Sequence, residues 1–294
     1  MWGEQMTGHI EYIKGHTPDR RRTIRIKRSA LLKDKLDDID RPSIKIAETN
    51  DELEQAFSLV QQEYLRSGYI KEPNPSGMHC TIYNILPETA VFIFKSYLKV
   101  VATLTLILDN EHFGLPMDAI YQKELNVLRD KDRKLAELSA LAVPRELRWH
   151  NLFMYLFRAM YWYAVYNKVN DLCIMINPKH VKFYKTIFFF EEFGEEKFYP
   201  KVGAPAVALR LNLDIIEDKV REKYSPLDFD CDLLSFFRRT RGILSIDNEN
   251  LFRNKRVMDA GAIKYFFIEK SDILINESTD NINYIKSLYP EIAI

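Results

Sequence analysis

The pattern of hydrophobic and polar positions between residues 43 and 213 switches repeatedly between a period of two and a period near 3.6. Short β-rich runs predict strands at residues 44–47, 90–96, 100–108, 136–143, 171–176 and 202–213. Apolar residues at helical spacing predict helices at residues 49–68, 117–128, 152–166 and 177–189. The second and third strands are close enough in sequence to form an antiparallel hairpin.

Residues that favour helix starts and strand irregularities support these boundaries. Thr49 followed by Glu52 predicts a capping-box start for the first helix. Asn177 caps the last helix of this region, and Pro178 takes its first position. Pro205 inside the final strand predicts a bulge or a sheet edge, because proline cannot donate a ladder hydrogen bond.

The rest of the chain differs in composition from this region. Residues 68–87 are dense in Pro, Gly and Asn and predict an irregular loop, of the kind that often forms a lid or binds a ligand. Further helices are expected at residues 214–224, 232–241, 258–268 and 280–288. We therefore predict a basic N-terminal extension (1–42), one main domain (43–213) and a helical C-terminal appendage (214–294) that packs on the domain or covers its pocket.

Composition and charge narrow the functional classes. The 294 residues are 47% hydrophobic, which is ample for a packed core. The 42 basic and 42 acidic side chains cancel, so no overall field favours a nucleic acid, and none is expected as a partner. Three widely spaced cysteines suit a reducing compartment without disulfides. The N-terminus does not resemble a signal peptide, and the most apolar helix is interrupted by Arg158, so we expect a cytoplasmic protein.

A basic run at residues 20–28 has two interpretations. Ile24 and Ile26 alternate there with charged residues, as in a solvated tail or an edge strand. The same run could dock an acidic partner or make peripheral contact with an anionic membrane surface. The sequence leaves both interpretations open.

Four side chains in two stretches are candidates for catalysis. Alternation along the strand 136–143 places Glu137 and Ser139 on the same face. His180 and Tyr184 lie one turn apart on the helix that Asn177 caps, and so also share a face. Each has a plainer interpretation, since an acid at a strand end is often only an ion-pair partner and a helical tyrosine is often part of the core.

A candidate phosphate site follows the strand 136–143. Arg145 and Arg148 lie in the turn after the strand, His150 comes next, and Asn151 is expected to cap the helix that follows. The amides at a helix N-terminus, flanked by cations, can cradle a phosphate. The glycines that usually let a backbone wrap a phosphate closely are missing here.

The order strand, helix, hairpin, strand, helix, strand, helix, strand resembles the GNAT-type N-acyltransferase fold. That fold is an α/β fold in which helices flank a twisted, mixed and mostly antiparallel sheet. Asn177, His180, Tyr184 and Phe189 resemble its Asn-x-x-Ala-x-x-x-Tyr…Gly-Phe motif, with His180 in place of Ala and Phe188 in place of Gly.

One branch of that fold is more similar still, the long-chain N-acyl amino acid synthases, which are related to acyl-homoserine-lactone synthases. Several unusual segments of this chain resemble those of its members and fall in the same order, over about residues 43–214. These segments are GYIKEPNPSGMHC, LPETAVFIF, VVATLTLILD, GLPMD, AELSALAV and NPKHVKFYKTIFFFEEFGEEKFYPKVGAPAVAL.

The resemblance implies a reaction and roles for the candidate residues. An acyl group would pass from an acyl-phosphopantetheine thioester to the amine of an amino acid or related amine. The thioester is a co-substrate on acyl carrier protein or coenzyme A, and no tightly bound cofactor is implied. Glu137 would be the base, directly or through water, and Tyr184 would protonate the leaving thiolate. His180 would orient Tyr184 or the thioester, or be a structural histidine, and Ser139 is a weaker catalytic candidate.

Two departures from the relatives bear on the substrates. Acyl-homoserine-lactone synthases carry an arginine after the serine of their Glu-x-Ser-Arg motif, whereas Ala140 follows Ser139 here, which argues against that acceptor. The absence of phosphate-loop glycines favours acyl carrier protein over coenzyme A, since one phosphopantetheine phosphate needs less wrapping than a pyrophosphate.

Substrate-binding residues are also suggested. An acceptor carboxylate would bind a cation, for which Arg129, Arg133 and Arg145 are candidates. Phe153 and Phe157 could wall an acyl tunnel, although a plain core would have the same composition. Two alternatives remain beside a carrier-protein-dependent synthase: a coenzyme A-dependent N-acyltransferase, and a non-catalytic sensor that binds acyl chains or acyl carrier protein.

Overall fold

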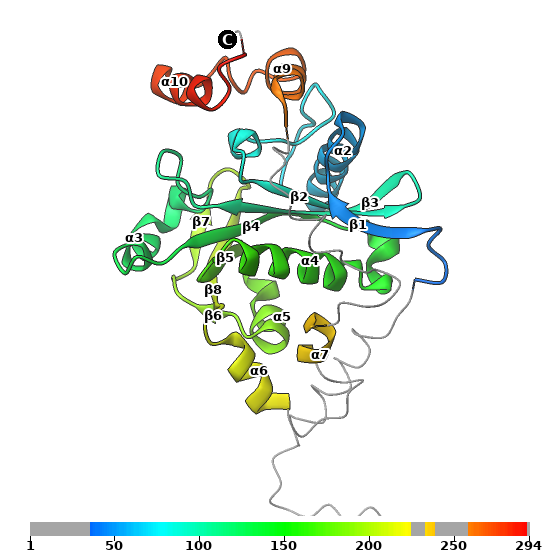
Figure 1. Cartoon of the computed structure of the whole chain (residues 1–294), viewed down its shortest axis with the longest axis vertical. Coiled ribbons are helices and arrows are strands. Elements are labelled where there is room, and N and C mark those ends of the chain that lie inside the picture. The colour runs from blue at the N-terminus through cyan, green and yellow to red at the C-terminus, as the bar shows by residue number, and fades with distance from the viewer. Residues whose placement is uncertain (1–35, 225–232, 239–257, 293–294) are drawn as a thin grey trace, which may run out of the picture.

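The computed structural model describes residues 36–224, 233–238 and 258–292, which are built around one eight-stranded sheet (Figure 1). The strands are β1 (Pro42–Ile46), β2 (Ala90–Ser96), β3 (Lys99–Leu108), β4 (Leu135–Ala142), β5 (Asp171–Ile176), β6 (Glu191–Glu192), β7 (Lys197–Tyr199) and β8 (Ala204–Asn212). Their order across the sheet is β1-β2-β3-β4-β5-β8-β6, and β7 pairs with β8. Every pairing is antiparallel except that of β4 with β5, which is parallel and connected through a helix.

The described α-helices are α2 (Asn50–Ser67), α3 (Asp118–Arg129), α4 (Leu152–Tyr166), α5 (Pro178–Phe188), α6 (Ile216–Tyr224), α7 (Leu233–Arg238), α9 (Ala260–Lys264) and α10 (Thr279–Leu288). Two 3-10 helices, η1 (Ile82–Ile85) and η2 (Arg145–His150), and one π-helical turn, η4 (Tyr265–Glu269), complete the elements. The predicted strands and helices of the main domain are confirmed. The basic run at residues 20–28 lies outside the described residues, so both of its interpretations stay predictions.

The two faces of the sheet are covered by different helices (Figure 1). On one face, α4 packs against the β-sheet in the largest apolar cluster, together with α5 and residues of α6 and α7. On the other face, α2 packs with the segment 258–292 in a second cluster. α3 covers the same face nearer to β5 and β8 in a third cluster. Each strand in the middle of the sheet is therefore buried on both faces, which explains its continuous apolar sequence.

The helix starts follow the signals in the sequence. The Thr49 side chain accepts a hydrogen bond from the Glu52 amide at 3.2 Å, and the helix ends at Gly68, whose φ of 74° suits glycine. Asn177 caps α5 by accepting from the Lys179 amide at 3.2 Å. Both caps satisfy amides that a helix N-terminus leaves without partners.

The final predicted strand is more elaborate than expected. It corresponds to β8, and the short strands β6 and β7 beside it were not predicted. Pro205 faces Phe198 of β7, in the part of β8 that extends beyond its pairing with β5. The edge interpretation of Pro205 is therefore confirmed, because one side of β8 has no strand partner there within the described part of the chain.

The described residues after Asp214 lie in two separate places. α6 and α7 join the cluster around α4, whereas residues 258–292 join the cluster around α2 on the opposite face. The predicted division at residues 42 and 213 stays a prediction. The helices after it contribute to both apolar layers of the main domain.

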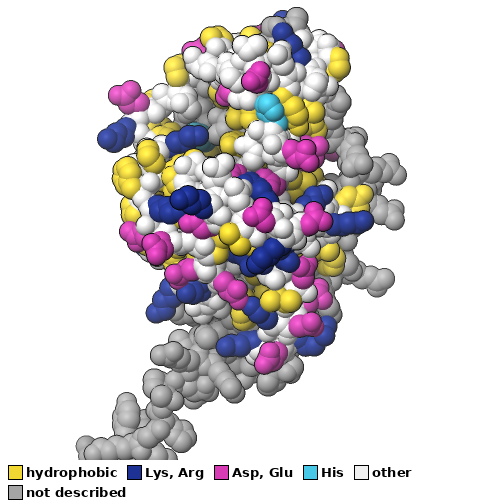
Figure 2. Space-filling model, turned by 90° about the vertical axis from the view of Figure 1, so that its left-hand side faces the viewer, with side chains coloured by type: hydrophobic (Ala, Val, Ile, Leu, Met, Phe, Trp, Pro, Cys, Tyr) yellow, Lys and Arg dark blue, Asp and Glu magenta, His cyan; other side chains and the backbone are white. Residues whose placement is uncertain are grey.

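The surface of the molecule carries both signs of charge. Figure 2 shows Lys and Arg side chains interspersed with Asp and Glu on the face it presents, as the cancelling charges predict. None of the helices in the described ranges is long and apolar enough to span a membrane.

Candidate active site

β4 and β5 separate toward their C-terminal ends. Their parallel pairing ends where Leu138 faces Ile174, although β4 continues to Ala142 and β5 to Ile176. Backbone groups beyond this point are no longer joined across the two strands. An opening between neighbouring strands in a covered sheet gives a ligand access to backbone amides.

A β-bulge on β4 accompanies this opening. Thr105 faces Ser139, whereas Thr103 faces Ala142, so β4 contains one extra residue between these pairs. Ala140 lies within the bulge at a φ of 48°, a left-handed conformation that costs a non-glycine residue about 1 kcal/mol or more. Bulges of this kind bend a strand and often lie beside active sites.

Glu137 is buried on the face of β4 that α3 covers. Only 2% of the residue is exposed, and one carboxylate oxygen (Oε2) accepts a hydrogen bond from the Met117 amide at 2.8 Å. Burial raises the pKa of the Glu137 carboxyl to about 8. The Met117 hydrogen bond and the charge of Lys201 lower this pKa, and the charges of Asp118 and Asp109 raise it. A carboxyl that titrates near neutral pH is suited to proton transfer.

Three phenols come from distant parts of the chain to the surroundings of Glu137. Burial raises the pKa of the hydroxyls of Tyr64, Tyr83 and Tyr199, and the charge of Glu137 contributes to the increase for each of them. A backbone hydrogen bond at Ala140 opposes the increase for Tyr64, which places that phenol beside the bulge. The carboxylate therefore has a polar but largely enclosed environment.

Tyr184 lies on the other side of the sheet, on α5. It is half-buried, and burial raises the pKa of its hydroxyl. The nearby phenol of Tyr69 makes a further contribution to this increase. Its ring packs against four phenylalanines, with centroid separations of 5.5 to 6.0 Å: Phe153, Phe183, Phe188 and Phe190. A phenol with a raised pKa holds its proton at neutral pH and can donate it.

The C-terminal ends of β4 and β5 carry positive groups. His180 is exposed on α5, and its pKa is lowered first by partial burial and then by the charges of Lys179 and Arg148. Arg148 belongs to η2, which follows β4, whereas Lys179 follows β5. The structure therefore brings the two candidate stretches together at the opening.

The predicted phosphate cradle is only partly as expected. Arg145 and Arg148 are exposed on η2, but His150 is only 3% exposed and points into the protein. Asn151 occupies the N-cap position of α4 at a φ of 58° without a side-chain capping bond. The predicted N-cap position is therefore confirmed, but the expected side-chain capping bond does not form, because Asn151 has a left-handed backbone after a tight 3-10 turn instead of the extended backbone of a capping residue.

Arg129 and Arg133 lie near the opposite ends of the strands from the opening. Arg129 binds Asp109 at 2.7 Å and Asp118 at 2.6 Å, and these partners raise its pKa. Arg133 is paired with the buried carboxylate of Asp171, which raises its pKa in the same way. Both arginines already have carboxylate partners within the protein, and their predicted role in binding an acceptor stays untested.

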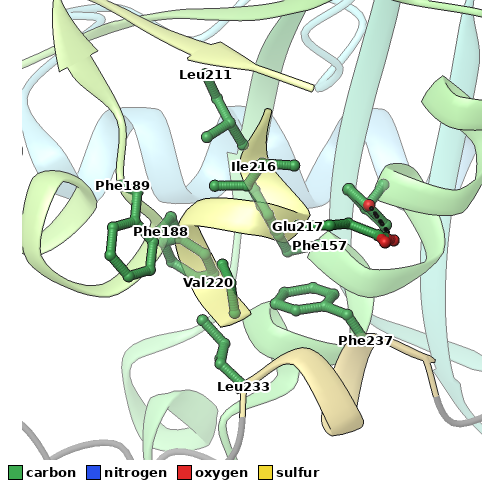
Figure 3. A pocket seen from close by; sticks show the side chains of 10 residues that line it. Phe157, Phe188, Phe189, Leu211, Ile216, Glu217, Val220, Leu233 and Phe237 are labelled. Atoms are coloured by element: carbon green, nitrogen blue, oxygen red, sulfur yellow. Dashed lines mark hydrogen bonds between the residues drawn. The ribbon is translucent and has the colours of Figure 1, made fainter. Parts of the chain in front are cut away.

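An apolar cavity lies below the sheet, where α4, α5 and β8 meet α6 and α7 (Figure 3). Phe157 lines it, whereas Phe153 packs next to Phe157 at 5.7 Å, toward Tyr184. The remaining lining residues are Tyr161, Phe188, Phe189, Leu211, Ile216, Glu217, Val220, Leu233 and Phe237. Both the tunnel and the core interpretation of Phe153 and Phe157 fit this arrangement.

Metal-binding and thiol groups contribute little to this region. In residues 36–224, 233–238 and 258–292, no three His, Cys, Asp or Glu side chains form a group that could hold a metal ion. Cys173 pairs with Glu137 across β4 and β5, and burial raises its pKa well above the usual value. This cysteine is therefore a thiol packed beside the carboxylate at neutral pH.

Comparison with known proteins identifies the family of the chain. The family model of N-acyl amino acid synthase FeeM matches residues 55–212, more than half of the chain. The chain belongs to this family. The solved structure of FeeM, from uncultured soil microbes, is 28% identical with a TM-score of 0.54, over 61% of this chain and 95% of that one.

Acyl-homoserine lactone synthases also match, with lower similarity. The coenzyme A-dependent synthase BjaI is 16% identical, with a TM-score of 0.47 over 60% of this chain and 88% of that one. LasI is 21% identical, with a TM-score of 0.43 over 58% of this chain and 89% of that one. No curated protein matches the sequence. With its membership of the FeeM family, the chain is an N-acyltransferase with a GNAT-like fold, as predicted.

Several residues that surround Glu137 were not identified as candidate site residues from the sequence. These are Tyr64, Tyr83, Met117, Tyr199 and Lys201, which approach Glu137 from four separate segments. One signal was available, since Tyr83 belongs to the irregular loop 68–87 that was predicted to bind a ligand. The others lie at ordinary positions in a helix, a strand or a turn and are identified only by their proximity to Glu137.

Proposed function

We propose that this N-acyltransferase moves a long-chain acyl group from an acyl-carrier-protein thioester to the amine of an amino acid, giving an N-acyl amino acid. The observation that carries the proposal is the buried Glu137 carboxyl, whose pKa is near 8, on one side of the opened strands, with Tyr184 on the other. The family match supports the same reaction class.

The chemistry assigns one proton transfer to each side of the opening. The amine nitrogen attacks the thioester carbon, and Glu137 accepts the proton that the nitrogen loses, directly or through water. The carbonyl oxygen becomes negative in the tetrahedral intermediate and requires hydrogen-bond donors, which backbone amides near the bulge can supply. The carbon–sulfur bond then breaks, and Tyr184 donates its proton to the departing thiolate. Proton exchange with solvent afterwards restores both residues.

The donor is a carrier-protein thioester in this proposal. Arg145, Arg148 and Lys179 are exposed at the opening and can attract an acidic partner and the phosphate of its phosphopantetheine. The tight turn η2, which has no glycine, leaves little room for backbone to wrap a pyrophosphate. Coenzyme A remains the alternative donor, and direct comparison separates the two.

The acceptor's carboxylate is assigned to Lys201. This lysine lies in the turn between β7 and β8, is exposed, and contributes a positive charge at Glu137. Two hydrogen bonds attach the hairpin formed by β7 and β8 to α3. Lys197 donates to the Ile120 carbonyl at 2.9 Å, and the Tyr121 hydroxyl donates to the Ala206 carbonyl at 2.7 Å. An amino acid could then direct its amine to Glu137 and its carboxylate to Lys201.

The donor experiment uses the purified full-length enzyme with the same long acyl chain on acyl carrier protein or on coenzyme A. A panel of amino acids is supplied, and the products are identified by mass spectrometry. We expect N-acyl amino acids with at least tenfold higher kcat/KM from the carrier protein. Higher efficiency with coenzyme A would reassign the donor. Stoichiometric acyl-carrier binding without turnover of any amine would support the sensor alternative instead.

The acceptor experiment compares an amino acid with its decarboxylated amine in wild type and in Lys201→Met. We expect the variant to raise KM about tenfold for the amino acid and to leave KM for the decarboxylated amine unchanged, because only the former has a carboxylate to bind. Lys123→Met, which removes an exposed lysine of α3, is the matched control. Equal effects of Lys201→Met on both acceptors would contradict the assignment.

A further inference from the structure

The helix α10 lies outside residues 55–212, which the family model matches, yet it contacts a loop next to Glu137. Its Tyr284 ring stacks on the His112 ring with centroids 4.4 Å apart and planes only 6° apart. The Tyr284 hydroxyl accepts a hydrogen bond from Asn110 Nδ2 at 2.9 Å. Asn281, one turn earlier on the same helix, lies 2.8 Å from His112 Nε2 through its side-chain oxygen. Two successive turns of α10 therefore hold the same loop.

Asn110 organises the loop that α10 holds. Its side-chain oxygen accepts from the amides of His112 at 2.9 Å and Phe113 at 3.0 Å, and its carbonyl accepts from Gly114 at 2.6 Å. A Cβ at Gly114 would lie 2.5 Å from a carboxylate oxygen of Asp118, so the close approach here requires glycine. The side-chain amide of Asn110 thus links the internal order of the loop to Tyr284.

The same loop ends at the amide that binds Glu137. Leu115 donates to Asp118 at 2.7 Å, and the Met117 amide, two residues later, donates to Glu137 at 2.8 Å. Leu115 and Met117 are fully buried. Arg129 joins both ends of the loop by binding Asp109 and Asp118. A displacement of residues 110–114 would therefore be transmitted to the Met117 amide.

We propose that Tyr284 is a positioning residue for catalysis: α10 holds the loop 110–117 closed over Glu137, so the C-terminal segment completes the site from outside the residues that the family model matches. This inference rests on the proposed role of Glu137 as the base. It assigns to residues 279–288 a function in the chemical step in addition to their contribution to the apolar cluster that also contains α2.

The test compares Tyr284→Phe with Tyr265→Phe in the full-length enzyme. Tyr284→Phe keeps the ring stacked on His112 but removes the acceptor of the Asn110 bond. Tyr265→Phe also removes one phenol hydrogen bond of the C-terminal segment, which Tyr265 donates to Glu54 at 3.0 Å. Within the described residues, Tyr265 has no hydrogen bond to the loop 110–117, so this variant is the matched control. We expect Tyr284→Phe to lower kcat about fivefold to tenfold with little change in the acceptor's KM, and Tyr265→Phe to leave both unchanged.

The pH profile separates positioning from simple loss of stability. A loosened loop admits water to Glu137 and weakens burial, the largest cause of its raised pKa. Weakening of the Met117 hydrogen bond acts in the opposite direction but is the smaller cause, so the pH at which activity is half-maximal should fall below that of wild type. The other groups that act on Glu137 are unchanged: Asp109, Asp118, Lys201, Tyr64, Tyr83 and Tyr199. Asn281→Ala, which removes one of the two contacts of His112 with the same helix, is expected to shift the profile in the same direction.

Wild-type rates and profiles for both Tyr284→Phe and Asn281→Ala would overturn the inference, as would losses of kcat that merely track Tm in all three variants. Retention of full activity by Glu137→Gln would instead show that the proposed base is wrong. The two failures are therefore distinguishable.

Discussion

The two sides of the opened strands are built in different ways. Glu137 has a polar enclosure in which the Met117 amide, phenols and a lysine come from segments far apart in the sequence. Tyr184 has an aromatic enclosure whose members, such as Phe153 and Phe188, belong to the neighbouring helices α4 and α5. The carboxylate side depends on tertiary contacts, whereas the phenol side depends on two adjacent helices.

The difference has a physical reason. A buried carboxyl must be kept near its useful pKa by a balance of burial, hydrogen bonding and several charges, and these can only be supplied from many directions. A phenol needs only burial to keep its proton at neutral pH, and apolar packing supplies that. We therefore expect the two sides to differ in their response to substitution and to pH.

The largest effect is expected for Glu137→Gln. Removing the base while keeping the side chain's size should lower kcat about 10³-fold, or roughly 4 kcal/mol, because the amine must then lose its proton to water. Steady-state turnover of N-acyl product measures this. If kcat fell less in Glu137→Gln than in Tyr184→Phe, the larger catalytic contribution would come from the phenol side, contrary to the comparison of the two sides.

A second effect of Glu137 is on stability as a function of pH. The pKa of this carboxyl is raised to about 8 in the folded state, so its stabilising contribution is present below the unfolded pKa and is lost as pH rises through 8. The Glu137→Gln side chain stays neutral at every pH. The free energy of unfolding of the variant minus that of wild type should therefore be larger at pH 9 than at pH 5, by roughly 2 to 4 kcal/mol. Urea unfolding at both pH values measures this, and parallel curves would contradict the burial of an ionising group.

Of the two catalytic side chains, Tyr184 is expected to give the smaller effect when it is replaced by Phe. Loss of the hydroxyl should lower kcat about 30-fold, or roughly 2 kcal/mol, since a thiolate can also leave without an acid. The ring keeps its contacts with Phe153 and Phe188, so Tm should change little. Acyl transfer at several pH values, together with thermal unfolding, provides the measurement. Unchanged turnover would leave Tyr184 as a core residue only.

Much of the fold could be predicted because local rules determine it. The Asn177 cap, the Pro178 start and the apolar period of residues 152–166 each depend on neighbours within a few residues. Asn151 is at the predicted N-cap position of α4, but its side-chain capping bond is missing because a 3-10 turn formed just before it, which a short-range pattern does not reveal. The short strands β6 and β7 were missed because two or three residues carry too little pattern.

The candidate site divides in the same way. Glu137 and Tyr184 were identified through motif spacing on one strand and one helix, and their catalytic roles stay proposals. Lys201 and Tyr284 had no signal of their own, since one lies in a turn and the other on a helix beyond the matched region.

The sequence by itself determined where the strands and helices lie, where two helices begin, and which family the chain resembles, because these depend on periodicity and short motifs. Only the tertiary structure decided that β4 bulges at Ala140, that Met117 binds Glu137, and that α10 reaches the loop 110–117. These contacts join residues that are tens to more than a hundred positions apart. Their energies depend on packing and burial that no local pattern records.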